Sequence, residues 1–347
     1  MFKMKSTWVG NGVLALLIAS AGLYGKRPES RSALPVGWPD RLQKPLILEH
    51  THWDGNLIST IHGNHGDIVS YHLTGNSGLE WPKGSGKTAS FQSGIWMASG
   101  KVRGPGATEW TEELRTAAAE YTVEYVPGIL GADQGDNKYR IYEIFKAERD
   151  AFLAGETEAA FDHDHDGIET TISLPTPDWV DWPVEDGAPW VDVDGDGDYD
   201  FTIDYPAILG DQFHWYVMND GEEAGHTGLW ATKPMNVEIQ TSLFGFSASG
   251  PLENILFVRW VIINKGTEEL DSVFVSMWHD DDVGDANDDL VASDTSLSLG
   301  WTFNAGTDAV YGVEVPPRGG ISFRDPPWKV QETRRRSLRG VSRKVIT

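Results

Sequence analysis

The sequence of 347 residues contains no cysteine. Disulfide bonds, thiolate metal sites and thiol nucleophiles are therefore excluded, and so is lipidation of an N-terminal cysteine. An exported protein without disulfides has to gain its rigidity from core burial and from bound metal ions.

Basic residues are scarce, because 28 Lys and Arg stand against 52 Asp and Glu and give a formal net charge of −24. Such a chain repels a polyanion, so we expect no nucleic-acid partner. The same excess of carboxylates favours the binding of divalent cations.

Recognised catalytic motifs are also missing. There is no H-E-x-x-H sequence, and Gly245–Ser249 lacks the last glycine of G-x-S-x-G. The run G-S-G-K-T at 84–88 is similar to the end of a phosphate-binding loop, but Trp81 occupies the position of its first glycine. These absences predict a protein that is not an enzyme.

The long apolar run of the chain lies at the N-terminus. Lys3 and Lys5 precede the apolar residues 13–18, and Ala19–Ala21 forms an A-x-A cleavage site. This pattern predicts a signal peptide over 1–21, with an uncleaved N-terminal anchor as the alternative. No later segment is apolar enough to span a membrane, so we expect a soluble mature chain that is extracellular or at the cell surface.

Tryptophan, in contrast, is abundant, with 15 residues. Indole rings bury large areas and suit β-sheet packing. After a leader or linker at 22–50, the alternating apolar pattern predicts an all-β, antiparallel, β-sandwich-like domain over 51–317 with long acidic loops. The Pro- and Trp-rich connector at 175–190 is a candidate boundary within this domain.

We expect at most one or two short helices. Lys146–Ala160 contains good helix formers, and we expect Gly155 to break this helix. Ile255–Ile263 is nearly all apolar and predicts a central strand that is buried on both faces. A turn at 265–270 would connect it to Val273–Trp278 as a hairpin.

The most informative stretch is the acidic loop within Trp190–Asp211. Aspartates alternate with glycines there, as in the first six positions of a calcium loop, where carboxylates at positions 1, 3 and 5 surround the ion. Ile203 stands at position 12, where an EF-hand has glutamate, and Asp204 follows it. The predicted Ca²⁺ ligands are Asp192, Asp194, Asp196, Asp198 and Asp204.

A second loop repeats this spacing with Asp162, Asp164, Asp166 and Gly167. We expect Ca²⁺ here as well. The interleaved His163 and His165 allow a transition-metal site as an alternative, although alternate positions should point away from the aspartates.

A third acidic cluster follows an apolar strand and predicts another cation site, with Asp280, Asp282, Asp285 and Asp288 as ligands. For all three clusters the alternative is a solvated acidic loop that binds nothing specific and aids solubility.

The last residues, 318–347, differ in character, since nine Lys or Arg stand there against Asp325 and Glu332. No apolar periodicity remains, so we expect a basic, disordered tail. The change indicates a frame-shifted or truncated reading of a longer gene, and the alternative is a functional basic tail.

Several motifs run in order over most of residues 55–315, namely T-G-N-S-G-L-E-W-P-K-G-S-G-K-T (74–88), F-Q-S-G-I-W (91–96), A-A-E-Y-T-V-E-Y-V-P-G (118–128), G-A-P-W-V-D-V-D-G-D-G-D-Y (187–199), I-L-G-D-Q (208–212), L-F-V-R-W-V-I-I-N-K-G (256–266) and W-H-D-D-D-V-G-D-A-N-D-D (278–289). They resemble a group of large secreted bacterial surface proteins that carry a C-terminal sorting domain for type IX secretion. The resemblance implies a β-rich N-terminal region followed by Ig-like repeats. It ends at about residue 317, where the family continues with an apolar, aromatic stretch.

Together these features predict an exported, non-enzymatic β-domain with Ca²⁺-stabilised loops that serves as a structural or adhesive module. A variant of this hypothesis has exposed tryptophans binding polysaccharide or other cell-surface components. The alternative is a secreted carbohydrate-active hydrolase with paired carboxylates, for which Asp280 and Asp282 beside Trp278 are the candidates.

Overall fold

The protein is described by a computed structural model. It describes residues 2–4, 8–17, 48–69, 77–119, 124–133, 135–227, 230–304, 306–312, 319–324 and 331–332. The first two and last two of these ranges are described as backbone strands only.

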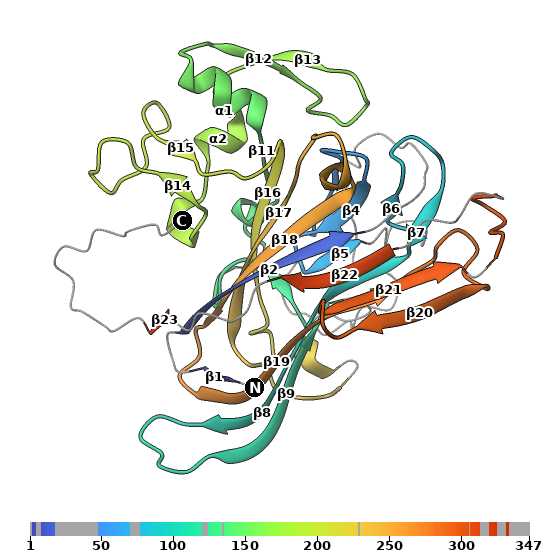
Figure 1. Ribbon diagram of the computed structural model, residues 1–347. Coiled ribbons are helices and arrows are strands. Elements are labelled where there is room, and N and C mark those ends of the chain that lie inside the picture. Colours follow the sequence, from blue (N-terminus) through green and yellow to red (C-terminus); the bar gives the residue numbers. More distant parts are fainter. Residues whose placement is uncertain are drawn as a thin grey trace.

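The largest sheet has ten strands and forms one layer of the molecule (Figure 1). Its strand order is β10 (Val126–Pro127), β16 (Gln212–Asn219), β17 (Val237–Gly245), β18 (Ile255–Asn264), β2 (Trp8–Leu17), β22 (Gly319–Arg324), β21 (Leu299–Asn304) and β20 (Asp289–Asp294). Two further strands join it, β11 (Tyr142–Phe145) beside β16 and β23 (Gln331–Glu332) beside β2.

Two smaller sheets complete the sandwich. The five-stranded sheet contains β1 (Phe2–Met4), β19 (Glu269–Asp280), β8 (Gln92–Arg103), β5 (Asp67–Val69) and β9 (Thr111–Ala118). The four-stranded sheet contains β3 (His50–Trp53), β4 (Ser59–Gly63), β6 (Leu79–Glu80) and β7 (Thr88–Ser90).

The remaining elements are short. Two hairpins are formed by β12 (Glu158–Phe161) with β13 (Thr170–Ser173) and by β14 (Trp190–Val191) with β15 (Tyr205–Pro206). The α-helices are α1 (Lys146–Leu153) and α2 (Pro177–Val180), and the 3₁₀ turns are η1 (Asn137–Tyr139), η2 (Val184–Asp186), η3 (Gly225–Thr227) and η4 (Pro251–Asn254). The prediction of an all-β, antiparallel sandwich-like fold with at most two short helices is confirmed.

The main core lies between the sheets. Residues on the inner faces of β8, β17 and β18 interdigitate there, and Ile95, Ile239 and Val258 are fully buried. Burying side chains of this size contributes about 1.5–3 kcal/mol each, so this layer supplies most of the stability.

A second core covers the outer face of β16 and β17. Trp182, just after α2, packs there against Phe213 and Trp215, and Trp179 of α2 packs against Phe152. The connector at 175–190 is thus attached to the sheet through buried indole rings, and the segment from α1 to β15 forms the cap seen above the sheet (Figure 1).

The strand that is buried on both faces is β16 rather than β18. All eight residues of β16 are buried, because the main core covers one face and the cap covers the other. Along β18 buried and half-buried residues alternate, so the prediction that both of its faces are buried was wrong.

The predicted hairpin of 255–263 with 273–278 was also wrong. β18 pairs with β17 and β2, whereas β19 pairs with β8 in the other sheet. The Asn264 side chain accepts a hydrogen bond from Gly266 N and donates one to Glu268 O. This tight turn moves the chain from one layer of the sandwich to the other.

The predicted helix at 146–160 is confined to α1. Glu148 caps it by accepting from the N–H of Phe145 at 3.0 Å. The helix ends before Gly155, whose φ of 75° lies in the left-handed region that glycine tolerates. The following residues then form β12.

Both ends of the chain contribute strands. Trp8–Leu17, within the segment expected to be a signal peptide, pairs with β18 and β22. β22 and β23 fall within the segment expected to be a disordered tail, while most of that tail and most of the leader at 22–50 lie outside the described residues. In the described part of the chain, none of the helices has the length and apolar character needed to cross a bilayer.

Candidate metal loops and a buried histidine–carboxylate network

Two loops of the cap bring three aspartates together each. We call them the first aspartate loop, 162–167 between β12 and β13, and the second aspartate loop, 192–197 between β14 and β15. Within each loop, one carboxylate oxygen from each of three aspartates lies within 4.8 Å of the others. The residues are Asp162, Asp164 and Asp166 in the first loop and Asp192, Asp194 and Asp196 in the second.

The two loops have the same internal hydrogen bond. The carboxylate of the first aspartate accepts from the N–H of the glycine five residues later, at 2.9 Å for Asp162 and Gly167 and 3.2 Å for Asp192 and Gly197. The two glycines have φ of 86° and 88°, in the left-handed region where a side chain would be strained. The spacing of glycine in the sequence is therefore explained by the backbone of the turn.

The donor set of each loop consists of carboxylate oxygens alone. Oxygen ligands suit the hard cations Ca²⁺ and Mg²⁺, and three carboxylates in one loop suit Ca²⁺ better, because Mg²⁺ is usually bound through one or two carboxylates. Three like charges within this distance repel one another, and a divalent cation would remove the repulsion. The residues present therefore fit the ion predicted from the sequence.

The other two predicted ligands of the second loop lie outside this group. Asp198 is exposed, and its backbone N–H donates to Asp196. Asp204 is 1% exposed and accepts from the N–H groups of Val193 and Asp200 at 2.9 and 2.8 Å. Asp204 thus connects the two sides of the loop through these hydrogen bonds.

The carboxylates of the third acidic cluster do not come together as those of the two aspartate loops do. Among the described residues, Asp280, Asp282, Asp285 and Asp288 do not supply three ligand atoms within 4.8 Å of one another. Asp285 accepts from Asn287 in its own turn, and Asp288 accepts from Asn304 on β21. Burial, followed by the like charges of neighbouring aspartates, raises the pKa of Asp280 and of Asp282.

His165 links the first aspartate loop to the interior. Its φ of 59° is uncommon for a residue with a Cβ, and its side chain is 2% exposed while the neighbouring Asp164 and Asp166 are exposed. The expectation that the histidine side chain points away from the aspartates is confirmed for His165. Its imidazole enters a group that we call the histidine–carboxylate network, made of Asp54, His62, Glu143, His165 and His214.

The network is a continuous chain of short contacts. His165 lies between two carboxylates, with Nδ1 2.9 Å from Asp54 and Nε2 3.3 Å from Glu143. The same Glu143 oxygen lies 2.7 Å from Nε2 of His214 and accepts from Gln212 at 2.6 Å. His214 Nδ1 in turn lies 2.8 Å from Nε2 of His62, which is fully buried.

Opposite charges in the network stabilise the ionised forms of His165 and Glu143. Burial alone would lower the pKa of His165, but the charge of Glu143 and the hydrogen bond to Asp54 raise it to about 10. Burial alone would raise the pKa of Glu143, but His165 and His214 hold it well below its usual range. His165 is therefore an imidazolium between two carboxylates at neutral pH, and this arrangement is a structural ion pair.

His52 and His62 are neutral at physiological pH. Burial, and then the charge of His165, lower the pKa of His52 to about 4. Burial, and then the charge of His214, lower the pKa of His62 well below its usual range.

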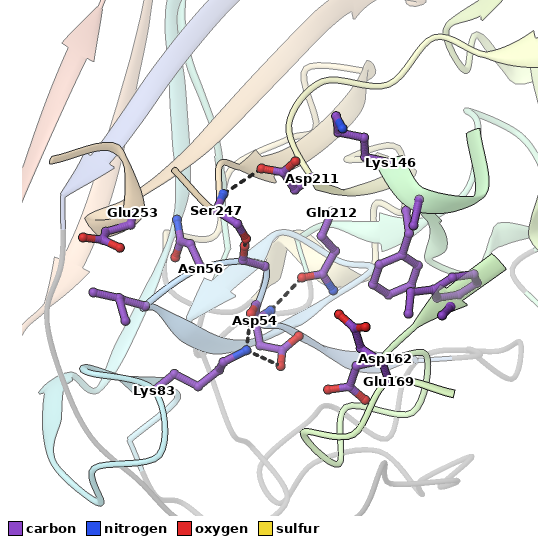
Figure 2. A pocket seen from close by; sticks show the side chains of 16 residues that line it. Asp54, Asn56, Lys83, Lys146, Asp162, Glu169, Asp211, Gln212, Ser247 and Glu253 are labelled. Carbon is purple, nitrogen blue, oxygen red and sulfur yellow. Dashed lines mark hydrogen bonds and ion pairs between the residues drawn. The ribbon is translucent and has the colours of Figure 1, made fainter. Parts of the chain in front are cut away.

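An open cleft of about 490 Å³ lies at the surface end of the network. Figure 2 shows Asp54 on its floor, bonded to Gln212 and to Lys83, with Asp162 and Glu169 close together on another wall. The first aspartate loop thus borders the cleft through Asp162. Asp280 and Asp282, the candidates for a hydrolase, do not line this cleft.

The pH dependence of stability tests the imidazolium assignment. Because the pKa of His165 rises from 6.5 in the unfolded chain to about 10 in the folded protein, its contribution is complete below pH 6.5 and is lost as the pH rises through 10. The difference in unfolding free energy between the wild type and His165→Gln should therefore shrink between pH 7 and pH 10. Urea denaturation of both proteins over this range measures it, and a difference independent of pH would show that His165 is neutral.

Of the histidines of this network, sequence reasoning singled out His165 as a candidate metal ligand and missed His62 and His214. Four of the ten histidines of the chain, His50, His52, His62 and His65, lie within sixteen residues. That density was the one sequence feature that could have indicated a histidine cluster. It does not indicate that Glu143, His165 and His214 come from distant segments to join His62 in one network.

Comparison with known proteins adds no relative from which a function could be transferred. No family model, no curated protein and no solved structure matches this chain.

Proposed function

We propose that the chain is an exported, non-enzymatic β-domain in which Ca²⁺ bound by the two aspartate loops stabilises the cap, and that it serves as a structural or adhesive module at the cell surface. The observation that carries the proposal is the repeated geometry of the two loops, each with three carboxylates within 4.8 Å. The N-terminal sequence pattern supports export.

The exposure of both loops fits an extracellular role. Asp192, Asp194 and Asp196 are all exposed, so water can complete the coordination of the ion. Extracellular Ca²⁺ modules of modest ligand number have dissociation constants of about 10⁻⁴–10⁻³ M, which match the calcium concentrations outside cells. Ca²⁺ would act here as a clip, in place of the disulfides that the chain lacks.

The position of the tryptophans favours a scaffold over a glycan platform. Of the tryptophan side chains that the structure describes, Trp53, Trp179, Trp182, Trp215 and Trp260 are buried. Trp230 is exposed at 44%, but its ring is inclined by 82° to that of Trp96. The rings of Trp96 and Trp278 are parallel, but both side chains are only half-exposed.

Thermal unfolding with and without Ca²⁺ tests the proposal. At about 100 times the dissociation constant, each loop adds about 2.7 kcal/mol. At about 1–2 °C per kcal/mol for a chain of 347 residues, both loops together raise the melting temperature by about 5–10 °C over the protein in chelator. Mg²⁺ at equal concentration should give a smaller shift.

The matched control carries Asp164→Asn, Asp166→Asn, Asp194→Asn and Asp196→Asn. It should melt at the same temperature with Ca²⁺ and with chelator. A wild-type melting temperature that does not respond to Ca²⁺ would refute the proposal that bound Ca²⁺ stabilises the cap.

A further inference from the structure

A second kind of metal-ligand cluster is buried in the sandwich, apart from the aspartate loops. It consists of His50 on β3, His65 in the turn between β4 and β5, and Asp67 on β5. Asp67 is fully buried, His65 is 2% exposed and His50 is 8% exposed. A ligand atom from each of the three residues lies within 4.8 Å of the others.

One of the separations between these atoms, 3.5 Å, is that of two ligands around one ion, and the other, 3.1 Å, is that of a hydrogen bond. His50 Nε2 lies 3.1 Å from one oxygen of Asp67, and His65 Nε2 lies 3.5 Å from the other oxygen. Ligands on a tetrahedral Zn²⁺ with bonds of about 2.0–2.2 Å are about 3.3–3.6 Å apart. The contact of 3.5 Å is long for a hydrogen bond, but it is ordinary between two ligands of one metal.

The orientation of the rings agrees with these distances. The centroids of the His50 and His65 rings are 5.3 Å apart, and the rings are inclined by 80°. Both imidazoles therefore approach the Asp67 carboxylate from different directions and do not stack on each other.

The backbone is shaped to this cluster. A Cβ on Gly63 would overlap the carboxylate of Asp67 and would lie 2.8 Å from Cε1 of His65. Only glycine at position 63 lets β4 pass so close to the three side chains.

From this geometry we propose that His50, His65 and Asp67 form a buried site for one divalent transition-metal ion of the zinc class. Two imidazole nitrogens and one carboxylate oxygen suit Zn²⁺, Co²⁺ or Ni²⁺. Ca²⁺ is a poor match, because it takes six to eight oxygen ligands. The site is independent of the proposed function, since it shares no residue with the aspartate loops.

The test uses the full chain, freed of metal and then titrated with Co²⁺, whose visible absorption reports tetrahedral nitrogen and oxygen coordination. We expect one equivalent to bind with visible bands, and Zn²⁺ to displace it. Loss of an outer-shell partner typically weakens a metal site by about 10–100-fold, so loss of a ligand in His65→Gln or Asp67→Asn should weaken binding by at least about 100-fold.

Two controls separate this site from other metal binding. His163→Gln, which changes a histidine in the first aspartate loop, should leave the Co²⁺ spectrum and affinity unchanged. The variant with four Asp→Asn changes in the aspartate loops should lose its Ca²⁺ response and keep the Co²⁺ bands.

Near-UV circular dichroism shows whether each variant is folded. The wild-type titration decides the proposal even where a variant does not fold. If the wild type gives no saturable Co²⁺ band, or if His65→Gln binds Co²⁺ as tightly as the wild type, the cluster is a buried ion pair only and the proposal is overturned.

Discussion

Replacing Glu143 by alanine is expected to lower the free energy of unfolding by about 3–5 kcal/mol. The Glu143 carboxylate, with a side chain 10% exposed, accepts from Gln212 at 2.6 Å and lies 2.7 Å from His214 and 3.3 Å from His165. Its removal leaves a buried imidazolium with Asp54 as its remaining carboxylate in the network. Removing one partner of a buried ion pair is costly, because the remaining charge loses part of its compensation.

Urea denaturation at neutral pH measures this loss. Glu143→Gln, which keeps the volume and removes the charge, should also be strongly destabilised, and so separates the charge from the cavity. Glu158→Ala on the exposed face of β12 is the control and should change stability by no more than about 0.5 kcal/mol. Equal stability of Glu143→Ala and Glu158→Ala would refute the ionic description of the network.

Replacing Trp53 by alanine is expected to cost about 3–5 kcal/mol for a different reason. The Trp53 ring is fully buried, and its indole N–H donates to Gln212 O at 3.4 Å. A Cβ on Gly245 would lie 2.5 Å from this ring, so the indole packs directly on the backbone of β17. Its loss opens a cavity where the four-stranded sheet meets the large sheet.

The matched control is Trp230→Ala, since the Trp230 ring is 44% exposed. It should lose about 1 kcal/mol, the contribution of its edge-to-face contact with Trp96. Urea denaturation of both variants provides the comparison. Similar losses at the two positions would contradict the assignment of Trp53 to the core.

Much of the fold could be predicted from the sequence, because apolar and polar residues alternate along a β-strand that has one buried and one exposed face. β17 shows the limit of that signal. Its residues at 237–240 alternate in polarity, yet the strand is buried on nearly all positions, because the cap covers the face that alternation assigns to solvent. The alternation of polarity along a strand does not reveal that a segment from elsewhere in the chain covers its polar face.

The aspartate loops could be located because their geometry is local. The glycine five residues after the first aspartate is required by a turn that closes within six residues. The histidine–carboxylate network could not be located, because His165 meets Asp54 across 111 residues of sequence and His62 meets His214 across 152. Those contacts depend on the register of separate sheets, which single-sequence patterns do not fix.

Calorimetric titration of the full chain with Ca²⁺ tests the central claim most directly, because it counts the ions. The account predicts two ions for the wild type, one for Asp164→Asn/Asp166→Asn, one for Asp194→Asn/Asp196→Asn, and none for the combination. Asp198→Asn, an exposed aspartate outside both groups, should bind two. A wild type without binding heat, or the same stoichiometry in the combined variant, would contradict the claim that the loops hold calcium.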